Sequence, residues 1–307
     1  MQLLLGGLSA GTSVNYAGCL RHYMAFCASH GAAFPPSAIM AIAFATHLFQ
    51  SGASKASVAT HLSALRSACI DCGASLGPLE DPRIPRLLAG MARAAPAPRL
   101  ARVTRLPISG PLLSRLLASI SPSSPIGRSL RAGLALGFFG LLRAGEFCAK
   151  GAPHGVLLRH HVSWFPSYVS VLLVQSKMSL RGVSVKIFRS GAPVCPVELL
   201  REAWVGAPLS SAADPLLQDD QGLPLSYRTL LHFIKQQVRE FGFDPAAFGA
   251  HSLRIGGASQ LAASNLPATH IQALGRWTSE CYQRYIRLPD SSFERASASL
   301  AASMYGP

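Results

Sequence analysis

The segment HSLRIGGASQLAASNLPATHIQALGRWTSECYQRYIR, residues 251–287, carries the pattern that decides the fold of this 307-residue chain. Its apolar spacing and its Ser, Pro and Gly boundaries predict three short helices, at residues 252–264, 267–274 and 279–287. His251 and Arg254 stand three residues apart at the first helix start, which places them on one face. Gly256 and Gly257 follow at once, and each costs a helix about 1 kcal/mol relative to alanine. We expect close packing of another element against these glycines to offset that cost.

Charged and aromatic residues also recur at other points of the second half. Arg143 follows an apolar run, and Glu146 stands three residues after it. A charge at the end of a buried helix needs a partner, and Glu146 is near enough in sequence to be that partner. Lys177 lies in a polar loop between two predicted strands, and Trp277 follows a Gly-Arg pair. Taken singly, these residues are ordinary: a surface ion pair, a solvated lysine and a core tryptophan. Their order and spacing together are much harder to obtain by chance.

The rest of the second half predicts a mixed α/β domain. Alternation of apolar residues favours two strands, at 168–174 and 183–188, joined by a hairpin loop that holds Lys177 and Arg181. Helical spacing predicts further helices at residues 109–120, 126–139, 196–204 and 226–241. The predicted fold class is therefore mainly α with a small antiparallel β-sheet.

The first ~90 residues predict a small helical bundle. Thr12 and Ser13 are good N-caps for a first helix, and Ser37, after two prolines, opens a second. A third helix starts at Ser54 and carries one apolar face, formed by Val58, Leu62, Leu65 and Cys69. A short fourth helix covers about residues 85–94. Alternating Ala and Pro with three arginines then predict an extended basic linker at residues 95–107.

Composition and charge favour a polyanionic partner. The formal net charge is +14, and 49% of the residues are hydrophobic, enough for a sizeable core. Residues 1–70 contain no Asp or Glu, and residues 82–143 contain none either although they carry ten arginines. A genome with biased composition can raise arginine content, but it does not remove carboxylates from so long a run. Nucleic acid is therefore the first candidate partner.

The cysteines and the apolar runs exclude several other classes. The seven cysteines are scattered, and Cys69 and Cys72 form a lone pair without a second pair at zinc spacing, which favours free thiols. Their odd number and the lack of a signal peptide favour a reducing, intracellular compartment. The longest apolar run, residues 132–142, is too short to span a bilayer. No P-loop sequence occurs, which disfavours the common nucleotide hydrolases.

The charged and aromatic residues described above, taken in the order in which they occur, resemble the pattern of the tyrosine recombinase (phage integrase) family. The resemblance is strongest to its Cre-like members and to the recombinases of DIRS-like and Crypton-like mobile elements. The resemblance implies a helical, SAM-like core-binding domain at 1–94, a basic linker at 95–107 and a catalytic domain at 108–307. The positions that match the family's catalytic residues are Arg143, Glu146, Lys177, His251, Arg254, Trp277 and Tyr285. The DNA-binding candidates are Arg99, Arg102, Arg105 and Arg181.

The resemblance implies site-specific recombination or integration of a mobile element through a 3′-phosphotyrosine intermediate. Two guanidiniums can neutralise the phosphate without a metal, and the phosphotyrosine keeps the bond energy without ATP, so no cofactor is expected. The expected partner is double-stranded DNA, bound by a homotetramer of two dimers, with no membrane association. The protein is expected in the nucleus if the host is eukaryotic, and in the cytoplasm or nucleoid if it is bacterial.

Two departures from the family pattern leave alternatives open. Tyr285 follows Trp277 by eight residues where nine is usual, so Tyr282 is a second candidate nucleophile. The sequence Tyr-Ile-Arg at 285–287, which the Cre-like members share, favours Tyr285. Only 22 residues follow it, which implies a short exchange segment. The alternative functions are a decayed, non-catalytic DNA-binding protein of the same fold and a type IB topoisomerase-like nicking-closing enzyme.

Overall fold

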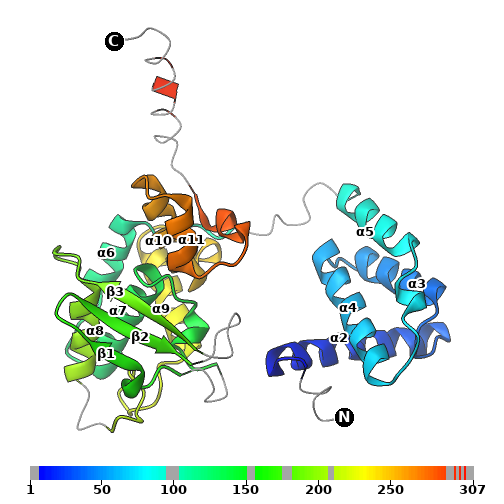
Figure 1. Ribbon diagram of the computed structural model, residues 1–307, viewed down its shortest axis with the longest axis horizontal. Coiled ribbons are helices and arrows are strands. Elements are labelled where there is room, and N and C mark those ends of the chain that lie inside the picture. Colours follow the sequence, from blue (N-terminus) through cyan, green and yellow to red (C-terminus); the bar gives the residue numbers. More distant parts are fainter. Residues whose placement is uncertain are drawn as a thin grey trace. The chain divides into compact units, whose positions relative to one another are not determined.

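The computed structural model describes residues 7–94, 104–150, 156–174, 182–206 and 211–287, with single positions at 294, 297, 298 and 301. The chain divides into two compact units, Met1–Leu100 and Ala101–Pro307, which are described separately (Figure 1).

The first unit is a bundle of helices with serine caps. Its helices are α2 (Ala10–His30), α3 (Ala38–Gln50), α4 (Lys55–Asp71), the 3₁₀ turn η1 (Gly77–Leu79) and α5 (Arg83–Arg93). Ser37 and Ser54 cap α3 and α4 as predicted, since each hydroxyl accepts from a backbone N–H three residues on. The prediction that Thr12 and Ser13 cap the first helix is wrong. Helix α2 begins at Ala10, and the Ser9 hydroxyl accepts from the Thr12 N–H instead.

Aromatic and aliphatic side chains fill the centre of this bundle. Tyr23 is fully buried, and its hydroxyl donates to the Ala33 carbonyl at 2.9 Å, so burying the ring leaves no polar atom unpaired. Phe44 packs edge-on against Tyr23 with ring centroids 5.1 Å apart. The predicted apolar face of α4 is confirmed, because its four members are all buried: Val58, Leu62, Leu65 and Cys69.

The second unit packs helices around a small sheet. Its α-helices are α6 (Gly110–Ala118), α7 (Pro125–Phe138), α8 (Pro196–Val205), α9 (Tyr227–Glu240), α10 (His251–Ala263) and α11 (Ala268–Gly275). Its described residues also form the 3₁₀ turns η2 (Ala144–Glu146), η3 (Arg159–His161), η4 (Pro245–Ala247) and η5 (Glu280–Tyr285). The predicted helix at 279–287 is thus a 3₁₀ turn, while the other predicted helices agree to within about two residues at each end.

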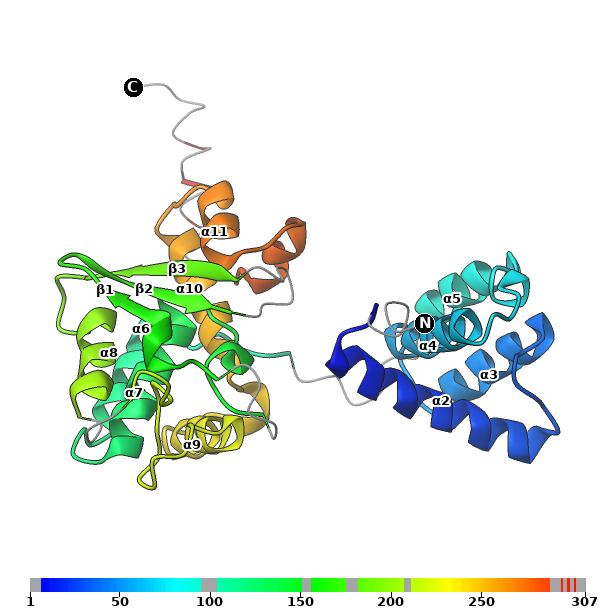
Figure 2. The same cartoon turned by 60° about the horizontal axis from the view of Figure 1, so that its bottom comes forward.

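The sheet has three antiparallel strands in the order β1 (Val162–Trp164), β2 (Tyr168–Leu173) and β3 (Val183–Phe188). Val171 of β2 pairs with both Val162 and Val185, and the alternate residues of the central strand are buried. Helices α7 and α8 lie on one side of the sheet (Figure 2). Strand β1 was not predicted, since three residues carry too little alternation to be recognised.

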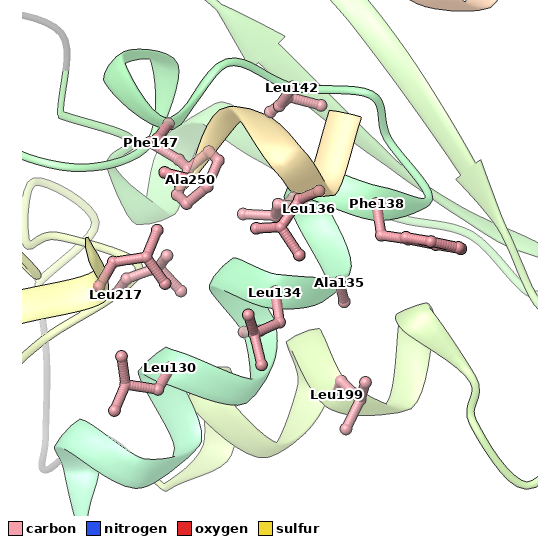
Figure 3. Packing of buried hydrophobic residues seen from close by; sticks show 14 of the residues in the cluster. Leu130, Leu134, Ala135, Leu136, Phe138, Leu142, Phe147, Leu199, Leu217 and Ala250 are labelled. Carbon is pink, nitrogen blue, oxygen red and sulfur yellow. The ribbon is translucent and has the colours of Figure 1, made fainter. Parts of the chain in front are cut away.

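Helix α7 lies at the centre of the second unit. Every residue from Ala132 to Phe138 is buried, and the helix contacts α8 on one side and α10 on another. Figure 3 shows Ala135 facing Leu199 of α8, while Leu136 lies beside Ala250, next to the start of α10. The apolar run that the sequence places before Arg143 is therefore a core helix. Arg143 follows its C-terminal end, on the side of the unit where α10 lies.

The glycines of α10 make this packing possible. A Cβ added at Gly256 would overlap the carbonyl oxygen of Ile108, and one added at Gly257 would overlap the carbonyl oxygen of Phe138. The predicted close approach of another element is confirmed. The absence of a side chain at Gly257 lets the backbone of α7 pack directly against α10.

The described part of the chain has the predicted fold class, mainly α with a small antiparallel sheet. Residues 104–107, which fall in the predicted linker, are part of the second unit, where Leu106 N–H donates to the Ala247 carbonyl at 2.8 Å. None of the helices in the described ranges is long and apolar enough to cross a membrane.

Candidate active site

The loop after α7 supplies the first part of a charged cluster. Leu141 adopts a left-handed backbone conformation with φ of 48°, which is unusual for a residue with a side chain and turns the chain sharply. Arg143 follows as N-cap of η2. Its backbone N–H donates to Glu146 Oε2 at 2.8 Å, and its Nη1 donates to Oε1 at 3.1 Å. The predicted pairing of these two residues is confirmed, and the Arg143 side chain is 27% exposed.

Arg254 is fully buried on α10. Its Nη1 donates to the Leu141 carbonyl, and its Nη2 donates to the Gly275 carbonyl at 2.5 Å. Its Nε is buried without a partner among the described residues. Burial, followed by the charges of Arg143 and Arg276, lowers the pKa of Arg254 to about 10, so the guanidinium stays charged at neutral pH.

The turn after α11 holds Arg254 from the other side. Gly275 has no room for a side chain, because the Trp277 ring lies where its Cβ would be. The Arg254 guanidinium lies 4.3 Å from the centre of that ring, a cation–π contact. The indole Nε1 of Trp277 is a second buried donor without a partner in the described part of the chain. Two unpaired buried donors side by side are costly unless an acceptor from outside completes them.

Tyr285 closes the cluster from η5, which lies beside α10 and α11 (Figure 1). Its ring centre is 4.9 Å from that of His251 and 4.8 Å from that of Trp277, and it lies 5.4 Å from Arg254 Cζ. Its backbone carbonyl accepts from Ser259 Oγ at 3.1 Å, which fixes η5 on α10. Tyr282 contacts Trp277 alone among these rings, at 6.4 Å. Tyr285 is thus the more central of the two tyrosines.

His251 lies at the exposed rim of the cluster, as the first residue of α10. Its pKa is lowered from 6.5, first by partial burial and then by the positive charges of Arg254, Arg143 and Arg105. The imidazole is therefore neutral at pH 7, and one of its ring nitrogens is free to accept a proton.

The charges of this cluster do not balance. Three guanidiniums, on Arg143, Arg254 and Arg276, surround one carboxylate, that of Glu146. Two positive charges are therefore left without a described counter-charge, in a place where solvent screening is weak. An anion with several oxygens, such as a phosphodiester or a pentavalent phosphate, suits such a site.

The structure brings together six of the seven predicted catalytic residues: Arg143, Glu146, His251, Arg254, Trp277 and Tyr285. Lys177 lies outside the described residues, as do the DNA-binding candidates Arg99, Arg102 and Arg181. Arg105 is described, and its Nη1 donates to the carbonyls of Ala246 and Phe248 at 2.8 and 2.6 Å. This contact leaves its charge near His251. No group of His, Cys, Asp or Glu in the described ranges could hold a metal ion.

Two features of the second unit were missed from the sequence, one in the site and one on the surface of α9. Arg276 belongs to the cluster, although only its place between Gly275 and Trp277 could have indicated it. A basic face of α9 is the other, with Arg228, His232, Lys235 and Arg239 along one side of the helix and a shallow hollow of about 250 Å³ over the last three. Its spacing of three and four residues was visible in the sequence.

Comparison of sequences finds no matching protein family and no matching curated protein. Solved structures do match. The integrase of transposon Tn1549 in complex with circular intermediate DNA has a TM-score of 0.62 at 11% identity, over 95% of this chain and 94% of that one. A lambda integrase dimer bound to a COC′ core site has a TM-score of 0.59 at 18% identity, over 92% and 90%. A lambda integrase tetramer bound to a Holliday junction has a TM-score of 0.56 at 16% identity, over 92% and 73%.

These matches define the class of fold to which the chain belongs. The structures it matches are tyrosine recombinases and integrases. The chain has the tyrosine recombinase fold.

Proposed function

We propose that this protein is a tyrosine recombinase, which cleaves and rejoins duplex DNA through a 3′-phosphotyrosine bond formed at Tyr285. The observation that carries the proposal is the gathering of Tyr285, His251 and Trp277 around the buried guanidinium of Arg254. A phenol, an uncharged imidazole and uncompensated guanidiniums are the groups that transfer of a phosphodiester to a tyrosine requires.

In the cleavage step, the Tyr285 oxygen attacks the phosphorus and the bond to the 5′ oxygen breaks. The phenolic proton passes to neutral His251, and Lys177 protonates the departing 5′ oxygen, so protons balance over the step. Arg143 and the unpaired donors of Arg254 and Trp277 bind the non-bridging oxygens as charge builds on them. Rejoining is the same step in reverse, with the phenolate as leaving group, and it requires neither metal nor ATP.

The basic face of α9 supports duplex DNA as the substrate. Its side chains Arg228, His232, Lys235 and Arg239 lie on the outside of the helix, while Leu230, Ile234 and Val238 face the core. Clustered basic side chains on one helical face are typical of contacts to a phosphate backbone. Lambda integrase, whose structure has the same fold, was solved as a dimer bound to a core site and as a tetramer bound to a Holliday junction. We propose the same assembly here, a homotetramer of two dimers on DNA.

The test is trapping of the covalent intermediate. Duplexes selected from a randomised pool by binding to the full chain are rebuilt with a nick beside each candidate cleavage position, so that the cleaved fragment diffuses away. We expect an SDS-stable, protease-sensitive protein–DNA band with the native chain and with Tyr282→Phe. Tyr285→Phe removes the attacking oxygen alone, and it is expected to bind DNA normally and form no band.

The other outcomes identify the alternatives. A band that persists in Tyr285→Phe and disappears in Tyr282→Phe makes Tyr282 the nucleophile. DNA binding without any band in the native chain identifies a non-catalytic DNA-binding protein. Relaxation of supercoiled plasmid by the monomer without strand exchange between two duplexes identifies a topoisomerase-like enzyme.

A further inference from the structure

Arg276 makes the contact to the active-site cluster for which the resemblance to tyrosine recombinases gives no explanation. It adopts a left-handed conformation with φ of 56° at the end of α11, and its side chain is 12% exposed. Its Nη2 donates to Glu146 Oε2 at 2.8 Å, and the same guanidinium approaches the carbonyls of Gly140 and Leu141 at 3.4 and 3.5 Å. The segments that it joins, after α7 and after α11, are about 130 residues apart in sequence.

The Glu146 carboxylate is therefore shared between two arginines. Oε1 accepts from Arg143 Nη1, whereas Oε2 accepts from the Arg143 backbone N–H and from Arg276 Nη2. A carboxylate held at both oxygens cannot rotate, so it offers Arg143 Nη1 an acceptor at a fixed position and restricts the orientation of that guanidinium. Arg143 Nε and Nη2 have no partner among the described residues, which leaves them available to a phosphate.

Charge compensation is a second way in which Arg276 affects Arg143. A carboxylate paired with Arg143 alone would neutralise that guanidinium and weaken its hold on an anion. Because Arg276 shares the carboxylate, Arg143 keeps part of its charge for the substrate. The burial of Arg276 lowers its pKa, and the contact with Glu146 acts in the opposite direction, so the two charged groups depend on each other.

We propose that Arg276 is a positioning residue for DNA cleavage, which holds Glu146 and through it sets the orientation and free charge of Arg143. The proposal rests on the proposed function. It predicts that Arg276→Gln slows formation of the covalent adduct on the order of 10- to 100-fold, the usual cost of a misplaced reacting group, without weakening DNA binding. Arg276→Lys keeps the charge but lacks the planar pair of donors, and it is expected to recover only part of the rate.

The decisive kinetic experiment is a double-mutant cycle under single-turnover conditions. If Arg276 acts through Glu146, the double variant Arg276→Gln/Glu146→Gln cleaves no more slowly than the slower single variant. Arg131→Gln is the matched control, because Arg131 also combines a carboxylate, Glu202 at 3.0 Å, with a backbone carbonyl, in the same unit but outside the site. It is expected to cleave at the native rate. The proposal is overturned if the rate losses of the two single variants add up in the double variant. It is also overturned if Arg276→Gln cleaves at the native rate.

A second readout does not depend on activity. The Arg143 Nε–H signal in ¹⁵N-arginine spectra, assigned with Arg143→Lys, should broaden or lose order in Arg276→Gln and remain unchanged in Arg131→Gln. An unchanged Arg143 signal in Arg276→Gln overturns the proposal, whatever the kinetics. If the native chain forms no adduct, the proposed function fails, and this measurement still decides whether Arg276 orders Arg143.

Discussion

His251 is the residue of the site whose charge changes nearest to neutral pH. If it accepts the Tyr285 proton, its neutral form is the active one. Because its pKa is lowered from 6.5, we expect the fall in adduct formation on the acid side to have its midpoint below pH 6.5. His251→Gln should form the adduct slowly at every pH and should not show this fall on the acid side. A native chain that loses activity already well above pH 6.5 contradicts the assignment.

The same shift has a consequence for stability. The unfolded chain takes up the His251 proton at a higher pH than the folded chain does, because its imidazole has the ordinary pKa of 6.5. The unfolded state therefore binds more protons in the window below 6.5, and this residue lowers the free energy of unfolding as the pH falls through it. Placing an uncharged imidazole beside guanidiniums thus favours catalysis at neutral pH at some cost to stability in acid.

At the scale of elements, the glycines of α10 decide how closely the helices pack. Gly256→Ala raises intrinsic helix propensity by about 1 kcal/mol, yet its Cβ would meet the Ile108 carbonyl. We expect overpacking to dominate and to destabilise the second unit by about 1–3 kcal/mol. The matched control is Gly90→Ala in α5, where nothing lies within 4 Å of the added Cβ, and we expect it to stabilise the first unit by about 0.5–1 kcal/mol.

Urea unfolding with two probes separates the two effects. All three tryptophans, Trp164, Trp204 and Trp277, belong to the second unit, so their fluorescence follows that unit alone. Far-ultraviolet circular dichroism follows both. A fluorescence midpoint that is unchanged in Gly256→Ala would mean that α10 and the backbone at Ile108 can separate slightly without loss of stability.

Local patterns were sufficient to predict most of these elements. Serine caps and apolar spacing located α3, α4 and α9, because each helix buries one continuous face. Strand β1 and the start of α2 could not be located, since three residues show no period and Ser9 competes with Thr12 as a cap. Six catalytic candidates could be named because each sits in a short motif. The contact of Arg276 with Glu146 could not be predicted from the sequence, because it depends on how two turns that are far apart along the chain pack together.

For the whole molecule, the charge distribution makes a prediction about DNA binding. Neutralising phosphates releases counterions, so the affinity for duplex DNA should fall steeply with salt, by a factor on the order of 10³ or more between 50 and 200 mM if six or more phosphates are contacted. Arg102→Ala/Arg105→Ala should weaken binding to all sequences alike. Arg239→Ala on α9 should reduce the slope of log K against log salt by about 1.

The control for this titration is an arginine whose charge is already compensated. Arg66 pairs with Glu80 at 3.1 Å on the surface of the first unit, so Arg66→Ala should leave the salt slope unchanged. A flat titration of the native chain from low to physiological ionic strength is incompatible with phosphate contacts as the source of affinity.

The burial of Arg254 also links the proposed cleavage activity to the completion of folding. Its two carbonyl partners, on Leu141 and Gly275, lie 113 and 21 positions away along the chain. A buried guanidinium without such partners costs several kcal/mol, so α10 cannot settle before both distant turns have arrived. The site proposed to bind the phosphate is therefore complete only when both turns are in place. If the proposed function holds, a nascent or partly unfolded chain could bind DNA through its basic surface but could not cleave a strand before it is able to reseal it.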